Sequence, residues 1–433
     1  MTATKQPQGM VSSTDYKISS LQLVTSTGNI VDISKIVLEL EIYEDIFAPV
    51  VTGSVRLADG GDIVSNFGLH GNEFLLLEID KPSLDKPITK VFRTYKLSDR
   101  DMGQSLQNYT LYFASEELIV SNQMVVSKAY SGVPISTMVN DILVKKLQVN
   151  PNKMKNGILE TSSGNFNIIV PRLDPFAAIE WLTPRAYAPN ENLFLFFENR
   201  DGFNFTSYEN LLKQPVYASY KRDIKIDTDP AKNLNSPTFL KVIEDFDILK
   251  SLRYGAYNTT LLNLDMIKRI MTTKTFGYKD IKPTGTLNGN VPDNGFKTRT
   301  NISLRDTSMS MIRFVLSDDS DPQSNPAHLE NWMPQTISRL AQLHTFKLVM
   351  TVPGDVLLKA GAVVHVTIPK ILNQQKSIAN DPIRTGKYLV SAVHHSFKQD
   401  IMITTIELLS DSVSVSLGSP LNTSQSLDKV KRA

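Results

Sequence analysis

The sequence contains no cysteine. Disulfide bonds, thiolate catalysis and cysteine-ligated zinc are therefore excluded, and the fold depends on the burial of apolar side chains. An excess of one charge is also absent, because 46 basic and 44 acidic side chains leave a formal net charge of +2. This balance gives no electrostatic reason to expect tight binding to nucleic acid or to an anionic membrane.

Long apolar runs are missing as well. The most apolar short run, Leu193–Phe197, is far shorter than the roughly 18 residues that a transmembrane helix requires. Residues 1–20 are polar and lack the apolar core of a signal peptide. We therefore expect a protein that is neither exported by a cleaved signal nor inserted in a membrane.

Motifs whose spacing implies a reaction mechanism are missing too. The sequence has no GxxxxGK[ST] phosphate loop, no GxGxxG fingerprint, no HExxH and no GxSxG elbow. His394 and His395 are neighbours on an expected strand, so their side chains point to opposite faces, and pairing either with His365 gives a poor metal site without a nearby carboxylate. We assign no catalytic residue, no cofactor site and no metal ligand.

One segment has part of a calcium-loop pattern. Asp319–Gln323, followed by Glu330, places acidic residues at positions one, three and twelve. Ser324 stands where the loop requires glycine, and two prolines stiffen the segment. A solvated acidic loop is the favoured interpretation, and binding of an ion between Asp319 and Glu330 stays open.

Other candidate sites have a simpler structural interpretation. The acid pairs Glu116-Glu117 and Asp318-Asp319 would serve hydrolysis only in a cleft that the sequence does not show, so charged turns are favoured. Basic and aromatic residues alternate at Arg185–Tyr187 and Tyr217–Arg222, but the balanced net charge argues against a nucleic-acid reader.

The patterns that are present are mainly those of β-strands. From about residue 18 to 115, apolar residues alternate with polar ones, and turn-forming segments such as Asp59–Asp62 separate the runs. Regular short strands of this kind predict a small antiparallel barrel or sandwich. The expected inward faces carry Ile36, Leu38, Leu40 and Ile42 in one run and Val51, Gly53, Val55 and Leu57 in the next.

Helical periodicity interrupts the strands in three places. The first predicted helix spans 134–147, and the second begins at Asp174 and ends or kinks at Pro184. Asp201-Gly202 between apolar runs predicts a hairpin after the second helix. The expected buried stripes are Ile135, Met138, Val139, Ile142 and Leu143; Phe176, Ile179 and Leu182; and Ile337, Leu340, Ala341 and His344.

Two distant stretches look like copies of one β-unit. The first begins at Gly71 and reaches Arg93-Thr94 after 22 residues; the second begins at Gly361 and reaches Arg384-Thr385 after 23. Chance resemblance between two β-meanders is the alternative, because short β-runs are alike in composition. Two equivalent domains in one subunit would let three subunits present six near-equivalent positions.

The order of these features resembles one family, the central hub proteins of phage baseplates. The resemblance covers roughly residues 18 to 415 and depends on order and spacing, since each motif alone is weakly specific. Its motifs are Gly53–Asp59, Ile63-Val64, Leu69–Glu73, the helices at 134–147 and Asp174–Trp181, the Phe194–Phe203 hairpin, the helix at 335–345, and the closing unit with Gly361 and Arg384.

The resemblance implies a mainly β fold with α+β segments: two tube-like antiparallel β-barrel domains and two mixed peripheral domains. It implies a homotrimer in the virion tail baseplate, assembled in the host cytoplasm, without membrane insertion. Its expected partners are a trimeric spike protein, the tail tube protein, the tape-measure protein, and baseplate wedge or sheath components, with DNA only in transit. The expected divisions are a disordered 1–17, a first tube domain 18–120, a mixed domain 121–215, a second tube domain 216–245 with 336–415, an inserted domain 246–335, and a flexible tail 416–433.

Two alternatives stay open beside the structural hub. One is a tail-associated cell-wall hydrolase, and the other is the hub of a related contractile secretion particle. The lumen and subunit-interface residues cannot be named from the sequence. The run Phe74–Ile79 is apolar on nearly both faces, so we expect a charged residue at Leu75 or Leu77 to block folding or ring formation.

Overall fold

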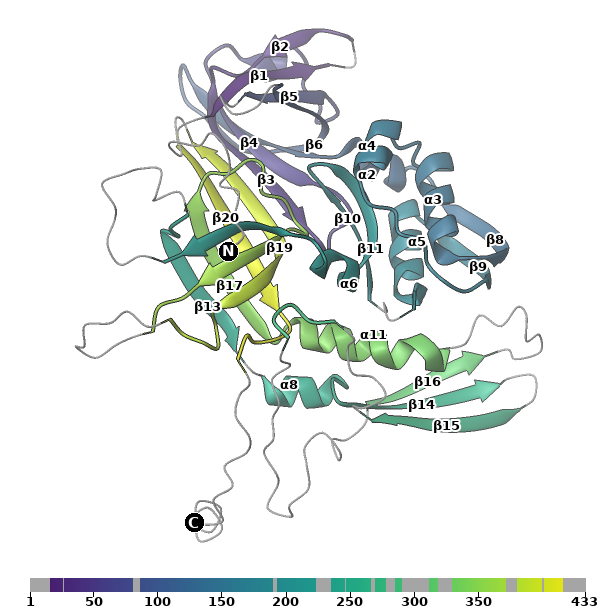
Figure 1. The fold of residues 1–433 in the computed structure, drawn as a ribbon. Helices are drawn as coiled ribbons and strands as arrows, with labels where there is room; N and C mark the ends of the chain where they lie inside the picture. The colour runs from purple at the N-terminus through teal and green to yellow at the C-terminus, as the bar shows by residue number, and fades with distance from the viewer. Residues whose placement is uncertain are drawn as a thin grey trace.

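The structure is a computed structural model dominated by one sheet of 13 strands (Figure 1). The mainly β fold class is confirmed. Among the described residues, no helix is long and apolar enough to cross a membrane. The structure describes residues 16–25, 27–80, 86–189, 193–222, 235–245, 247–265, 269–277, 285–289, 311–317, 329–370, 380–398 and 401–415.

The first part of the sheet comes from the N-terminal strands. Their order across the sheet is β3-β4-β7-β6-β5-β1-β2, and every neighbouring pair is antiparallel. The residues of this first strand set that face its core include Leu40, Val55 and Leu111. The strands are β1 (Lys17–Val24), β2 (Ile30–Asp32), β3 (Val37–Asp45), β4 (Thr52–Asp59), β5 (Phe74–Asp80), β6 (Ile88–Met102) and β7 (Gln107–Ala114), with the short helix α1 (Ile63–Asn66) after β4.

The C-terminal strands repeat that order. β13-β17-β20-β19-β18-β12 corresponds strand for strand to β3-β4-β7-β6-β5-β1, except that β12 runs parallel to β18. This second strand set has its own core, which includes Leu348, Val366 and Leu408. Its strands are β12 (Val216–Lys221), β13 (Phe239–Asp245), β17 (Phe346–Pro353), β18 (Val363–Thr367), β19 (Gly386–Lys398) and β20 (Ile401–Ser410).

The two sets also share a β-bulge. In β6, the pairing with β7 shifts between Thr94 and Lys96; in β19, the pairing with β20 shifts between Val390 and Ala392. A bulge bends its strand at a fixed point, so a shared bulge indicates a repeated unit rather than similar composition.

The sequence alignment of the two units was wrong in register. Arg93 pairs with both Phe74 and Ala114, and its equivalent is Leu389, which pairs with Val363 and Leu409. Arg384 lies before β19 begins. The two units are therefore repeats, but the two Arg-Thr pairs that suggested the repeat do not occupy equivalent positions in it.

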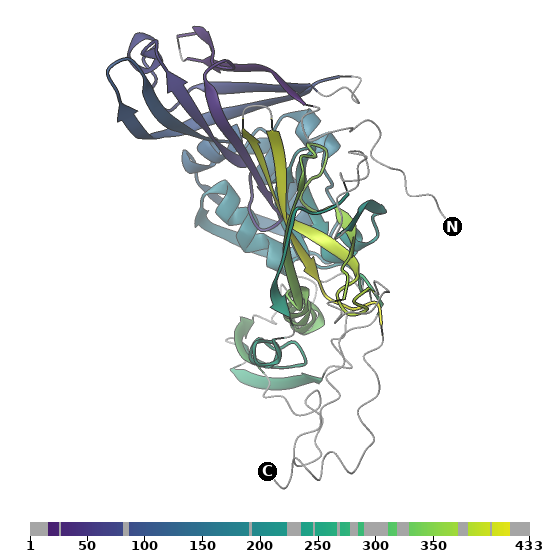
Figure 2. The same ribbon diagram turned by 90° about the vertical axis from the view of Figure 1, so that its left-hand side faces the viewer.

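The two strand sets are joined into one sheet. β3 pairs antiparallel with β19 over seven residues, from Glu39 opposite Lys398 to Asp45 opposite Ala392. Figure 2 shows the yellow strands of the second set directly beside the purple strands of the first. Each set thus curls over its own core, while the backbone hydrogen bonds continue from one set into the other.

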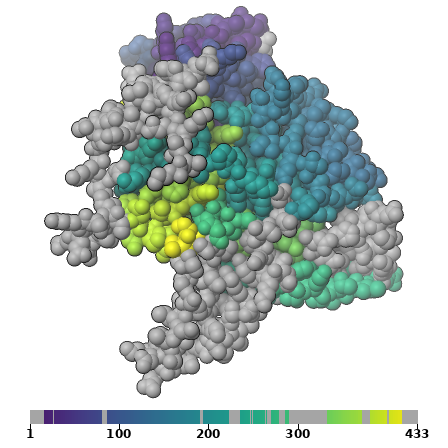
Figure 3. Space-filling model, viewed as in Figure 1, coloured from purple at the N-terminus to yellow at the C-terminus, as the bar shows by residue number. Residues whose placement is uncertain are grey.

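The segment between the two sets forms a lobe with a core of its own, visible in blue in Figure 3, and one face of its β10–β11 hairpin packs into the core of the second strand set. All five stripe residues predicted for the first helix are fully buried, which confirms α3. Asp174 caps α5 by accepting a hydrogen bond from Ala177 N at 3.0 Å, and Pro184 lies in a 3-10 turn after that helix. The elements are α2 (Glu116–Asn122), β8 (Val126–Val133), α3 (Ile135–Lys145), α4 (Pro151–Asn156), β9 (Phe166–Leu173), α5 (Pro175–Leu182), η1 (Thr183–Arg185), β10 (Phe194–Asn199), β11 (Gly202–Ser207) and α6 (Tyr208–Leu212).

The segment between β13 and β17 has a small sheet of its own. Its strand order is β15-β14-β16, and β14 runs parallel to β16. The stripe predicted for the helix before β17 was wrong, because Leu340 is 43% exposed while Arg339 and Gln342 are buried. The elements are α8 (Ile248–Arg253), β14 (Asn258–Asp265), β15 (Ile270–Gly277), β16 (Met311–Ser317) and α11 (Leu329–Leu343).

Candidate functional site

His394 and His395, two of the histidines singled out in the sequence, pack on opposite faces of β19. His394 stacks on Tyr43 with ring centroids 4.5 Å apart, while the neighbouring His395 is buried on the other side of β19. Burial lowers the pKa of His395 to about 4, and its ring nitrogens lie 3.1 Å from Thr404 Oγ1 and 3.2 Å from Leu358 O. Within the described residues, no group of three or more metal-ligating side chains occurs.

Of the two candidate acid pairs, Glu116-Glu117 lies within the described residues, and its two carboxylates have different partners. Glu117 is buried and its carboxylate lies 2.8 Å from Lys153 Nζ, which also contacts Glu198 at 2.9 Å. Glu116 is half exposed and lies 3.8 Å from Arg93. Asp318-Asp319 and the loop Asp319–Gln323 lie outside the described residues.

The basic and aromatic runs serve packing. The Arg185 guanidinium lies 3.8 Å from the Trp181 ring centroid. Tyr217 donates a hydrogen bond to Asp355 Oδ2 at 2.6 Å, and Tyr220 is buried in the core of the second strand set. A stacking platform for nucleic-acid bases needs exposed ring faces, which these tyrosines do not offer.

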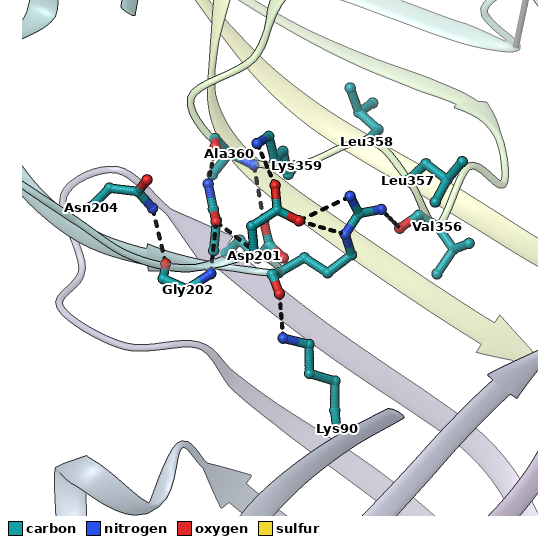
Figure 4. Close-up of polar contacts among 12 residues, drawn as sticks. Lys90, Asp201, Gly202, Asn204, Val356, Leu357, Leu358, Lys359 and Ala360 are labelled. Atoms are coloured by element: carbon teal, nitrogen blue, oxygen red, sulfur yellow. Dashed lines mark hydrogen bonds and ion pairs between the residues drawn. The ribbon is translucent and has the colours of Figure 1, made fainter. Parts of the chain in front are cut away.

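Several polar contacts lie where three parts of the fold meet: the two strand sets and the tip of the β10–β11 hairpin (Figure 4). At the tip, Asp201 lies 2.5 Å from Lys359 Nζ. Asn199 Nδ2 donates to Ala360 O at 3.1 Å, and Arg200 O accepts from Lys90 Nζ. The hairpin tip thus fastens β6 of the first set to the segment 356–360 of the second.

Glu44 completes this junction from β3, the strand of the first set that pairs with β19 of the second. Its Oε2 accepts a hydrogen bond from Ala360 N at 2.9 Å, and its side chain is only 4% exposed. Burial raises the pKa of Glu44 to about 7, against the opposing effects of that hydrogen bond and of the Arg200 and Lys90 charges. The junction therefore contains a carboxyl group that is largely protonated in mildly acidic solution.

Sequence reasoning predicted the hairpin but missed its docking site. Residues 40, 42 and 44 follow the two-residue period of a strand, so the period alone places Glu44 on the buried face of β3. A carboxylate on a core-facing position was the available signal, because such groups are rarely buried without a partner.

We expect Glu44→Gln to change the pH dependence of stability. Because the folded-state pKa is raised, the stabilisation by Glu44 is present below about pH 4.5 and is lost as the pH rises through 7. A shift of this size corresponds to about 3 kcal/mol. Chemical denaturation should therefore show that the free energy of unfolding of the Gln variant, relative to that of the natural protein, increases by about that amount between pH 4.5 and pH 8.

Glu116→Gln is the control, because it removes a half-exposed carboxylate outside the junction. A Glu44→Gln variant whose stability difference from the natural protein stays constant from pH 4.5 to 8 would show that Glu44 does not titrate as described.

A second buried charged cluster connects α11 to the rest of the fold. Arg339 Nε lies 3.1 Å from Glu209 Oε1, and Arg339 Nη1 lies 2.8 Å from Asp411 Oδ2. Its guanidinium also donates to Gly285 O at 2.6 Å and lies 4.5 Å from the Tyr208 ring centroid. Burial alone would lower the pKa of Arg339, but the two carboxylates outweigh it and raise the pKa.

Comparison with known proteins gives one curated relative. The chain is 21% identical over 390 residues to the probable baseplate hub protein gp334 of Vibrio phage KVP40, covering 87% of this chain and 90% of the relative. No family model matches.

Solved structures that share the fold include two tail proteins. One is the tail protein from Neisseria meningitidis MC58, with 12% identity, a TM-score of 0.54 and coverage of 92% of this chain and 97% of the other. The other is the 43 kDa tail protein of prophage MuSo2 from Shewanella oneidensis, with 8% identity, a TM-score of 0.55 and coverage of 91% and 99%. The resemblance inferred from the sequence is confirmed: along most of its length, this chain is similar in sequence to a probable baseplate hub protein of a phage and in fold to these two tail proteins.

Proposed function

We propose that the chain is the structural hub subunit of a phage tail baseplate. The observation that carries this proposal is the repeated strand order, with the same bulge, in two halves of one sheet. A subunit that carries one unit twice can form a threefold ring whose surface repeats six times. Such a ring can match a sixfold tube on one side and a threefold spike on the other.

In this proposal, the ring is built from residues 18–120 and from 216–245 with 336–415. Residues 121–215 and 246–335 decorate its outside. The ring joins a hexameric tail tube to a trimeric spike in the virion tail baseplate and contacts wedge or sheath components. Its channel lets the tape-measure protein and then DNA pass. The sequence similarity to a protein named as a baseplate hub supports this assignment.

The ring predicts the oligomeric state of the purified protein. Multi-angle light scattering should give three times the mass of one chain, and negative-stain images should show rings with six similar lobes. Only monomers, with or without an added spike protein, would contradict the ring. A clearing band on a cell-wall zymogram would instead favour a hydrolase.

A further inference from the structure

Among the described residues, several strands of the large sheet have an edge without a partner: β2, β12, β13 and part of β6. β6 pairs with β5 only from Ile88 to Arg93, so the same edge is open from Tyr95 to Met102. β13 pairs with β17 and has no strand on its other side (Figure 1). An open edge is a row of backbone donors and acceptors ready for another strand.

The repeat shows which strand fits the open edge of β6. The strand equivalent to β6 is β19. On the corresponding edge of β19, the first half pairs with β18 and the second half, Ala392–Lys398, pairs with β3. The equivalent of β3 in the second strand set is β13. β6 and β13 are separated by six strands along the sheet of one chain, so the partner is a second copy. We infer that β13 of one subunit adds antiparallel to the open edge of β6 in the next subunit.

The register of this contact follows from the pairing of β3 with β19, which is the seam between the two strand sets inside the chain. In that seam, His394 lies opposite Tyr43, Ser396 opposite Glu41, and Phe397 opposite Leu40. The residues of β6 that are equivalent to those of β19 follow from the pairing of each strand with its neighbour, β7 or β20. The residues of β13 that are equivalent to those of β3 follow in the same way from β4 and β17. The resulting pairs between subunits are Ser98 with Glu244, Asp101 with Lys241, and Met102 with Leu240.

The charges on the two edges are complementary in this register. Asp101 and Lys241 carry opposite charges, both are exposed, and they stand directly across from each other. The seam inside the chain uses the same device, with Lys398 Nζ 2.7 Å from Glu39 Oε1. The contact between subunits thus continues an interface that the chain already makes with itself.

Apolar side chains near both edges also point to a partner. Tyr95 is 46% and Met102 71% exposed on β6, and Phe239 is 49% and Ile243 48% exposed on β13. Apolar residues on an open strand edge favour aggregation unless another strand covers them. Since the contact joins two different edges, it repeats from copy to copy and either closes into a ring or grows into a filament. Closure after three copies rests on the proposed function.

Cysteine cross-linking tests the contact directly, because the natural chain has no cysteine. Asp101→Cys combined with Lys241→Cys, treated with a short bismaleimide, should give covalent dimers and trimers and nothing larger on a denaturing gel. The matched control combines Asp101→Cys with Lys155→Cys instead of Lys241→Cys. Lys155 is an exposed lysine on α4. The control should stay monomeric on the gel.

The outcomes separate this inference from the proposed function. A trimer mass in light scattering, with rings in negative-stain images but without the Asp101–Lys241 cross-link, would overturn the strand pairing and leave the ring. Monomers in light scattering would overturn both. Cross-linked products that continue beyond the trimer would support the pairing and contradict the threefold ring.

Charge reversal gives a second, independent test. Lys241→Glu places like charges opposite each other and should weaken subunit association about fivefold per contact. Adding Asp101→Lys should restore it, whereas Asp101→Lys alone should weaken it. Both residues are exposed in the single chain, so the melting temperature of the monomer should not change. A double variant that associates no better than the single ones would overturn the register.

Discussion

Arg339→Met will lower the free energy of unfolding by about 4 kcal/mol, because two buried carboxylates lose the cation between them. Glu209 and Asp411 are 7% and 0% exposed, so water cannot replace the guanidinium. Trp332 lies on the same helix and is 4% exposed. Its fluorescence in a Trp181→Phe background, followed through urea denaturation, reports unfolding around α11, since the chain has only two tryptophans.

Two further variants test whether the loss of stability in Arg339→Met comes from unpaired buried charge. Lys250→Met removes a lysine that is 42% exposed and bound to Glu244, and should cost at most about 1 kcal/mol. Adding Glu209→Gln and Asp411→Asn to Arg339→Met should recover much of the loss, because no unpaired charge stays buried. If the triple variant is no more stable than Arg339→Met, the loss comes from packing rather than from charge.

Leu77→Glu will prevent the first strand set from folding. Leu77 is 1% exposed in the core of that set, and an unpaired carboxylate there costs several kcal/mol, which is a large part of the stability of a domain. We expect insoluble protein, or soluble protein with reduced strand signal in far-UV circular dichroism. Leu75→Glu, at 0% exposure, should behave in the same way.

The neighbouring residue provides the control. Leu76 points to the other face of β5 and is only partly buried. Leu76→Glu should therefore fold, with a loss of about 1 kcal/mol. A Leu77→Glu protein that folds and forms rings would show that this side chain is not packed in the core.

The strand period predicted inward faces well where no bulge intervened. Gly53, Val55 and Leu57 are buried as expected. Leu38 was expected inside but is 37% exposed, because the pairing of β3 with β4 shifts between Val37 and Glu39. A single extra residue moves the side chains before it to the other face, and no sequence signal marked this one.

Helix stripes were predictable only where the buried face is apolar. α3 buries the five apolar residues that its period predicts. α11 instead buries Ser338, Arg339 and Gln342 beside Trp332. A stripe of polar residues looks like a solvated face in sequence, and only the carboxylates brought from α6 and the end of β20 make its burial possible.

By itself, the sequence determined the local features of this protein: which segments form the main strands and where α3 and α5 begin. Side-chain period and turn chemistry encode those features within a few neighbouring residues. The sequence suggested a repeated unit, but the strand order and the shared bulge that establish the repeat came from the structure. Only the tertiary structure decided that β3 pairs with β19, where the hairpin tip docks, and which edges stay open. Strand pairing depends on backbone groups that are the same in every residue, so a contact between segments about 350 residues apart leaves no local trace in the sequence.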